Sequence, residues 1–287
     1  MNLKKILVPV DFPNASLPVL HQAATLAHHF HSEMVMMHVV TMLSHAAGVP
    51  EDNSHLAGWN MVAEIIKAAQ NERDQTLGPE LDGLPIQRVL AKGGASKVIV
   101  QTSQEVKADL IMMPSRGHTF DQFLLGSAAI KWQHGTECPI WTGCHGKESQ
   151  SQKFEIRSVL CALDFTAQDR KAVEWAAYIA AEFGACLTLA YVTPGVESWG
   201  PGGSYVNTKW KDALVSDAVR HIAELQRNMN IKAEVFIGSG DVPKVLCHAA
   251  KQTKADLLVT GCRPYGDRLR THAYAIICAV PIPVLNV

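Results

Sequence analysis

Two aspartates, each directly after a short apolar run, are candidates for binding a ligand. Asp11 comes directly after the run 6–10, and Asp164 comes directly after a similar run, 159–163. A carboxylate at such a position can accept hydrogen bonds from hydroxyl or amino groups of a ligand. Aspartate also favours turns and caps of the following helix, so both interpretations stay open at both positions.

Two later segments combine glycine, arginine and hydroxyl side chains. The first contains Ser115, Arg116, Gly117, Gly126 and Ser127, and the second contains Gly261, Arg263 and Thr271. Glycine lets the backbone approach an anion closely, and the free N–H groups of a helix N-terminus then bind that anion. These residue types predict a phosphate site. A serine that only caps a helix, and arginines that are only solvated, are the alternatives.

The sequence carries no motif for covalent or hydrolytic catalysis: Gly-x-Ser-x-Gly and the Walker loop are both absent. Its seven cysteines include no Cys-x-x-Cys pair, so neither a zinc knuckle nor a redox pair is predicted. His21, His28, His29 and His31 lie in or near one predicted helix without a carboxylate or cysteine at metal-ligand spacing. We therefore predict no metal site, and we expect His38 to be packed inside a strand.

The elements that must position these residues occur twice, because Asp164 lies 153 residues after Asp11 and the similarity continues on both sides. In the first copy, strands are predicted at 6–10, 34–40, 86–90, 109–113 and 139–142, and helices at 16–31, 55–76, 97–106 and from about 127. Five strands alternating with four helices predict an α/β fold with a doubly wound parallel sheet.

Local signals in the second copy give three further predictions. Thr166 with Asp169 predicts a capping box at a helix start. Asp241 before Pro243 predicts an N-cap with an early proline. Residues 199–205 predict a flexible loop with two aromatic residues, and a lid or partner patch is the alternative reading of that loop.

The length and composition of the chain limit the number of domains and the kinds of partner it can have. The 287 residues suggest two domains, which we place at 1–145 and 154–287 with a polar linker at 146–153. A net charge of -1 argues against nucleic acid as a partner. No run is apolar and long enough to span a bilayer, and the first residues do not resemble a secretory signal. We therefore expect no membrane partner and a cytoplasmic location.

Several of these segments together resemble the universal stress protein family. They are the strand end Val-Pro-Val-Asp-Phe at 8–12, Ala-Asp-Leu-Ile-Met-Met at 108–113, the later Ser-Arg-Gly and Leu-Leu-Gly-Ser, and Cys-Pro-Ile at 138–140. The resemblance covers nearly the whole chain, twice. It implies two flavodoxin-like, adenine-nucleotide α-hydrolase-like domains with sheet order 3-2-1-4-5, paired through their last strands as a pseudo-dimer. Nucleotide-binding members carry Gly-x2-Gly-x9-Gly-[Ser/Thr] after the fourth strand.

The resemblance implies a site for ATP, or for ADP or AMP, in domain 1. Its candidate residues are Pro9, Val10, Asp11, Val39, Met113, Ser115, Arg116, Gly117, Gly126, Ser127 and Ala128. A weaker second site in domain 2 would consist of Asp164, Val192, Gly261, Arg263 and Thr271.

Neither half keeps the complete nucleotide signature. In domain 1, Pro114 replaces the first glycine, and eight rather than nine residues separate Gly117 from Gly126. In domain 2, Pro264 and Arg270 replace glycines, and proline has no N–H to donate. We therefore expect any nucleotide to bind more tightly in domain 1.

These observations predict a stress-response binding protein that is not an enzyme and whose domain 2 is degenerate. A ligand-free, dimer-like interaction scaffold is the alternative. A weak ATP hydrolase is less favoured, because that class generally has a glycine-rich loop after the first strand, and residues 11–16 contain no glycine. Besides binding a nucleotide, the two domains are expected to pair with each other within the chain. Homodimerisation of the whole chain stays open.

Overall fold

The computed structural model describes residues 2–10, 17–40, 78–114, 138–143, 154–195, 197–200, 203–206, 208–261 and 271–287. In the first half of the chain these residues form the strands β1 (Lys5–Val10), β2 (Glu33–Val40), β3 (Ile86–Lys92), β4 (Leu110–Met113) and β5 (Ile140–Thr142), and the helices α1 (Leu17–Phe30), α3 (Gly78–Leu81) and α4 (Ala95–Glu105).

The second half repeats this alternation and adds a hairpin. Its strands are β6 (Ser158–Leu163), β7 (Cys186–Thr193), β10 (Glu234–Ser239), β11 (Leu257–Thr260) and β12 (Val284–Asn286), with the hairpin strands β8 (Glu197–Gly200) and β9 (Gly203–Val206). Its helices are α6 (Gln168–Phe183), α7 (Thr208–Met229), α8 (Val242–Gln252) and α9 (Thr271–Ala279).

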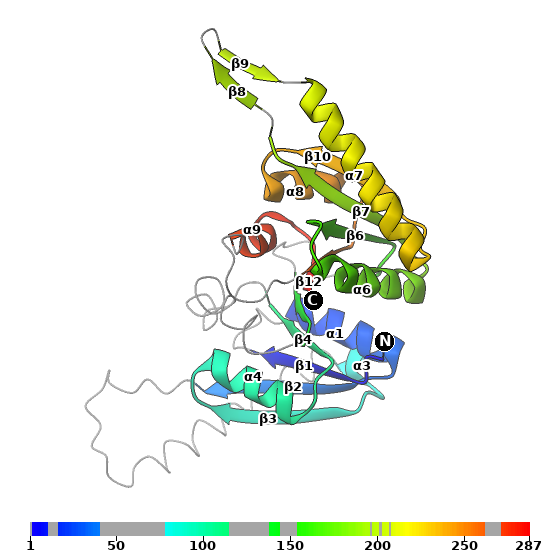
Figure 1. Ribbon diagram of the computed structural model, residues 1–287. Helices are drawn as coiled ribbons and strands as arrows, with labels where there is room; N and C mark the ends of the chain where they lie inside the picture. The colour runs from blue at the N-terminus through cyan, green and yellow to red at the C-terminus, as the bar shows by residue number, and fades with distance from the viewer. Residues whose placement is uncertain are drawn as a thin grey trace, which may run out of the picture.

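Ten of the strands form one continuous sheet in the order β10-β7-β6-β11-β12-β5-β4-β1-β2-β3 (Figure 1). Read outward from its centre, each half has its fifth, fourth, first, second and third strand in turn, which confirms the order 3-2-1-4-5. Within each half the strands pair in parallel. Inner strands such as β4 and β11 are buried at every position and, apart from Thr260, consist of apolar residues, because helices cover both faces of such a sheet.

The two halves meet at their last strands, as predicted. β5 pairs with β12 in the antiparallel direction, with Trp141 opposite Leu285. An antiparallel pair of equivalent strands is what a pseudo-twofold relation between the halves requires. One apolar cluster includes both of these side chains and continues into α1 and α6, so the two halves share a core.

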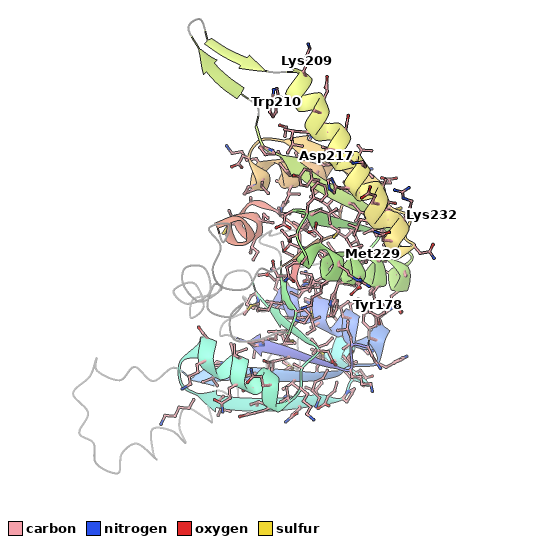
Figure 2. All side chains as sticks on the ribbon, in the orientation of Figure 1. Tyr178, Lys209, Trp210, Asp217, Met229 and Lys232 are labelled. Carbon is pink, nitrogen blue, oxygen red and sulfur yellow. The ribbon has the colours of Figure 1, made fainter. Side chains whose placement is uncertain are left out.

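Aromatic side chains of α1 and α6 add a second contact between the halves. His29 stacks on Phe183 with ring centroids 4.2 Å apart, and Phe30 stacks on Tyr178 at 5.7 Å. The two helices lie side by side in Figure 1, and Figure 2 shows Tyr178 at their boundary. The pairing of the halves therefore involves helices as well as strands.

The repeated Lys-Ala-Asp segment has a structural role at the amino ends of the strands. Oδ2 of Asp109 accepts the N–H groups of Lys4 and Lys5 at 2.8 and 2.9 Å. Oδ2 of Asp256 likewise accepts the N–H groups of Arg157 and Ser158 at 2.7 and 3.0 Å. Each aspartate therefore fixes the start of the first strand of its half to the start of the fourth.

Asp256→Ala is expected to lower the free energy of unfolding by about 1–3 kcal/mol, because two backbone N–H groups lose a charged acceptor. Asp256→Asn is the matched control and should lose less, since its amide oxygen can still accept both N–H groups. Urea unfolding followed by circular dichroism measures both. An Asp256→Ala protein as stable as the parent would contradict this role.

Two predictions about local structure are wrong in domain 2. Thr166 and Asp169 do not form a capping box: α6 begins after Ala167, no side chain caps it, and the Thr166 hydroxyl donates to Asp164. Residues 199–205 do not form a simple loop, because β8 and β9 pair as a hairpin with Gly200 opposite Gly203. The Pro-Gly dipeptide at 201–202 in the sequence is a turn signal that predicts such a hairpin.

The predicted start of α8 is confirmed, because Asp241 accepts the N–H of Lys244 at 3.1 Å with a proline in the first turn. The helices predicted at 55–76 and from about 127, and the linker at 146–153, lie outside the described residues. The boundaries 1–145 and 154–287 therefore stay predictions.

Candidate functional site

The structure brings the described site residues of domain 1 to one edge of the sheet. β1 lies between β2 and β4, and all three strands run in parallel. Pro9 and Val10 end β1, Met113 ends β4, and Val39 is the penultimate residue of β2. These residues therefore meet at the carboxyl edge, which is where open α/β sheets bind ligands.

The side chains at this edge form an apolar base. Val39 and Met113 are buried in the cluster on the α4 side, and Val10 is buried on the α1 side. Nδ1 of the buried His38 lies 3.1 Å from the carbonyl oxygen of Val10. His38 is thus packed inside β2, as predicted.

The other candidate residues of domain 1 lie outside the described residues. They are Asp11, Ser115, Arg116, Gly117, Gly126, Ser127 and Ala128. The last residue described before this gap is Pro114, which is buried. The carbonyl of Met113 accepts the N–H of Gly143 at 2.9 Å. The described base therefore offers mainly apolar contacts, and the polar contacts to a ligand would have to come from the residues beyond it.

The corresponding edge of domain 2 is described more fully, and its loop is held by its own side chains. Asp164 follows β6, and its Oδ1 accepts the N–H of Thr166 at 3.2 Å and the Thr166 hydroxyl at 2.5 Å. The carboxylate therefore makes local contacts within the turn, which corresponds to the loop-capping alternative considered from the sequence.

Asp169, the second residue of α6, holds this loop; from the sequence we predicted it only as part of a capping box. Its side chain is buried and accepts the N–H of Asp164 at 3.1 Å and the N–H of Phe165 at 2.7 Å. The pKa of Asp169 is raised to about 6, mainly by burial and also by the nearby Asp164 carboxylate, whereas the two N–H donors lower it. Asp169 is the second residue of α6, in a polar first turn, so the sequence carried no signal of its burial.

Phe165 is held in an unusual backbone conformation. Its φ is 58°, a left-handed value that is uncommon for a residue with a bulky side chain. The ring stacks on Tyr191 of β7 with centroids 4.0 Å apart and on His221 of α7 at 5.0 Å. Burial, and then the charge of Asp164, raise the pKa of Tyr191. These ring contacts help to stabilise the strained backbone conformation of Phe165.

Gly261, the first glycine of the domain 2 loop, has a packing reason to be glycine. A Cβ atom added there would lie 3.0 Å from the Cβ of Gln168. Val192 lies on the opposite face of β7 from Tyr191, in contact with the apolar cluster that contains α8. Thr271 begins α9, and Arg263 lies outside the described residues. The structure thus brings Asp164 and Val192 to the carboxyl edge of the sheet. Gly261 lies at the same edge, close to Gln168 of α6.

The histidines of α1 make protein contacts. His21 Nδ1 pairs with the Glu80 carboxylate of α3, and His28 Nε2 lies 2.8 Å from the Glu80 carbonyl oxygen. His29 Nε2 lies 3.5 Å from the Glu182 carboxylate of α6. Within the described ranges, no three histidine, cysteine, aspartate or glutamate side chains gather as a metal site would require.

Other described features do not coincide with the predicted sites. Burial raises the pKa of Cys138 to about 12 and raises that of Cys161 as well, so both thiols stay protonated. A shallow hollow of about 630 Å³ lies at the amino edge of domain 2, between the end of α6 and the starts of β7 and β10. Among the helices that the structure describes, none has the length and apolar character to cross a bilayer.

The model of the universal stress protein family matches residues 2–142 and again residues 155–287. A universal stress protein of Methanocaldococcus jannaschii is 29% identical over 140 residues, which are 48% of this chain and 79% of that protein. A universal stress protein A homologue of Coxiella burnetii is 29% identical over 147 residues, 48% of this chain and 93% of its own.

Two solved structures share the fold over the whole chain. A universal stress protein of Archaeoglobus fulgidus has a TM-score of 0.72 and 19% identity, covering 99% of this chain and 96% of its own. A functionally unknown protein of Pseudomonas aeruginosa has a TM-score of 0.65 and 13% identity, covering 99% and 92%. Both likenesses therefore extend across the two halves.

The fold and the two carboxyl edges define a tandem α/β protein in which one doubly wound unit occurs twice and pairs with itself. The double match to one family model then identifies the family: the chain belongs to the universal stress protein family and contains two copies of its domain.

Proposed function

We propose that this chain binds an adenine nucleotide (ATP, ADP or AMP) at the carboxyl edge of domain 1 and acts through conformation or partners rather than through catalysis. The observation that carries the proposal is the contrast between the two edges. In domain 2, Asp169 occupies the backbone donors of the first loop. At the equivalent position, 153 residues earlier, domain 1 has Ser16. The first loop of domain 1 thus lacks this internal carboxylate.

The residues of domain 1 match the chemistry of a nucleotide. Gly117 and Gly126 permit close approach of a phosphate to the backbone, and the Ser127 hydroxyl would add a donor at a predicted helix start. Asp11 would accept hydrogen bonds from the ribose or the base. The apolar base formed by Val39 and Met113 supports this assignment, because small-molecule sites are largely apolar with few polar contacts.

Mass spectrometry of the full chain, denatured directly after purification, provides the first test. We expect a co-purifying adenine nucleotide. Calorimetric titration with ATP, ADP and AMP follows, on the parent and on the matched variants Asp11→Ala and Asp164→Ala. Loss of a charged hydrogen bond should weaken binding about 10–150-fold in Asp11→Ala only. Absence of binding in the parent, or equal loss in both variants, would refute the assignment to domain 1.

A ligand-free interaction scaffold is the second candidate function. The shared core of the two halves and the proline that replaces the first glycine in domain 1 favour it. It predicts no co-purifying nucleotide and no binding heat. A weak ATP hydrolase, unlike a binding protein or a scaffold, would release inorganic phosphate from ATP, and Asp11→Ala would abolish that release. A cytoplasmic location belongs to the proposal and is testable by cell fractionation.

A further inference from the structure

The two end strands of the ten-stranded sheet, β3 and β10, differ in how well their outer edges are protected (Figure 1). Among the strands that the structure describes, β10 pairs only with β7, so its other side presents backbone groups that can pair with a further strand. Charged side chains usually protect such an edge, and β3 has Arg88 and Lys92 exposed. The only charged residue of β10 is Glu234, at its start, and Val235 is 44% exposed. β10 is therefore the less protected edge.

α7 adds an exposed flank beside this edge. His221 of α7 stacks on Phe165, which follows β6, so this side of the helix faces the inner strands of the sheet. Ser216, Val219 and Ala223 have the three- and four-residue spacing that places them together on another side. Val219 and Ala223 are each two residues from His221, which is about 200° around the helix, so their side faces the outer edge. We call these three exposed residues the outer flank of α7; Val219 is 49% exposed.

The edge strand is complementary to a second copy of itself in the antiparallel direction. Around a twofold axis at Phe236, this residue lies opposite its own counterpart. Val235 then lies opposite Ile237, and Glu234 lies opposite Gly238. Val235 and Ile237 share the α7 side of the sheet, and Phe236 lies on the α8 side. Apolar side chains therefore meet apolar side chains on both sides, and no like charges oppose each other within the strand.

The outer flank of α7 reaches the same axis. Oε1 of Gln226 accepts the N–H of Ala233 at 3.0 Å, which fixes the helix relative to the strand. Because α7 connects the parallel strands β7 and β10, it runs opposite to β10. Phe236 is three residues beyond Ala233 and Val219 is seven residues before Gln226, and both separations correspond to about 10 Å. Val219 and Phe236 therefore lie at the same level along the sheet edge.

An antiparallel pair of α7 helices around this axis is also complementary. Val219 meets its counterpart, and Ser216 lies opposite Ala223, so small side chains allow the helices to approach closely. At each end of this contact, Asp212 lies opposite Arg227, and both residues are exposed. Opposite charges at both ends favour this register over a shifted one.

We propose that a second copy of this chain pairs with the first through β10 and the outer flank of α7, in a twofold dimer that joins two ten-stranded sheets edge to edge. Such a contact uses the same surface on both copies and closes as a dimer. The pairing of α7 helices supplies the apolar burial that backbone pairing of two strands does not. This interface belongs to domain 2 and does not depend on nucleotide binding by domain 1.

Light scattering during size-exclusion chromatography and sedimentation equilibrium of the full chain test the dimer. We expect the parent to have the mass of two chains. Val219→Lys and Val235→Lys each bring like charges together near the axis and should raise the dissociation constant at least about 100-fold. Leu90→Lys is the matched control, because Leu90 is a 37% exposed residue of the opposite edge strand β3, and this variant should dimerise like the parent. Circular dichroism verifies each fold, and Val219→Lys suffices if Val235→Lys does not fold.

A charge exchange tests the antiparallel register. Asp212→Arg and Arg227→Asp each replace attraction by repulsion at two places in the dimer, and each should weaken it about tenfold. The double variant restores opposite charges and should dimerise within about twofold of the parent.

Three results would overturn the proposal. They are a parent that stays monomeric over the whole concentration range, a dimer that Leu90→Lys dissociates and Val219→Lys does not, and a double charge variant that fails to recover. Growth beyond two copies would also overturn it, because that result indicates pairing of β10 with β3 of the next copy, which does not close.

Discussion

Trp141→Ala is expected to lower the free energy of unfolding by about 3–5 kcal/mol, the range for removing a large buried aromatic side chain. Trp141 is fully buried in β5, where the two halves of the sheet pair. Its Nε1–H donates to Oε1 of Gln22 at 2.8 Å, and that glutamine is itself buried. The substitution therefore leaves a cavity and an unpaired amide in the core that both halves share.

Urea unfolding followed by fluorescence and circular dichroism measures this effect. Trp210→Ala is the matched control, because the Trp210 side chain is 64% exposed and its loss should change stability by only about 0.5 kcal/mol. Trp141→Phe should fall between the two, since it keeps an aromatic ring and loses the donor. If Trp141→Ala is no less stable than Trp210→Ala, the junction of the halves does not contribute to the core as described.

Gly126→Arg is expected to weaken nucleotide binding by the full chain while the fold survives. The change places in domain 1 the residue that domain 2 has as Arg270. The long arginine side chain would fill the space in which a phosphate approaches the backbone. An attraction between the arginine and the phosphate would be offset by the rotamer entropy lost on fixing that side chain, about 2 kcal/mol. We expect affinity for ATP to fall at least about tenfold, the loss of one charge-assisted hydrogen bond.

Thermal melts with and without ATP decide the outcome. The parent should show a ligand-induced rise in melting temperature, and Gly126→Arg should show a smaller rise at the same ATP concentration. Arg270→Gly is the matched control in domain 2 and should leave the parent's response unchanged, because Pro264 still lacks a donor there. A rise that persists undiminished in Gly126→Arg would show that Gly126 is outside any site. No rise in the parent would favour the scaffold.

Much of the architecture was predictable because it depends on short-range patterns. Continuous apolar runs such as 6–10 and 159–163 identified buried parallel strands, and the offset between Asp11 and Asp164 identified the duplication. The order 3-2-1-4-5 and the meeting of the last strands came from the family resemblance, and the structure confirms both. The cap at Asp241 was predictable because its partner, Lys244, lies within the same helical turn.

The roles of particular side chains were decided by tertiary structure. Asp109 and Asp256 looked like part of a strand motif, yet each binds backbone N–H groups about a hundred residues away in the sequence. Gly261 looked like part of a phosphate loop, yet the close approach of Gln168 explains its missing side chain. Such roles depend on distances between segments, which residue types and spacing do not specify.

By itself, the sequence determined the duplicated α/β unit and, through the resemblance, its strand order; the edge at which a ligand would bind stays a prediction. Only the tertiary structure decided that the first loop of domain 2 is held by Asp169, with Phe165 stacked between Tyr191 and His221. The physical reason is that strands and helices follow local periodicity, whereas burial of a charged group and stacking of rings from three separate elements depend on packing in three dimensions.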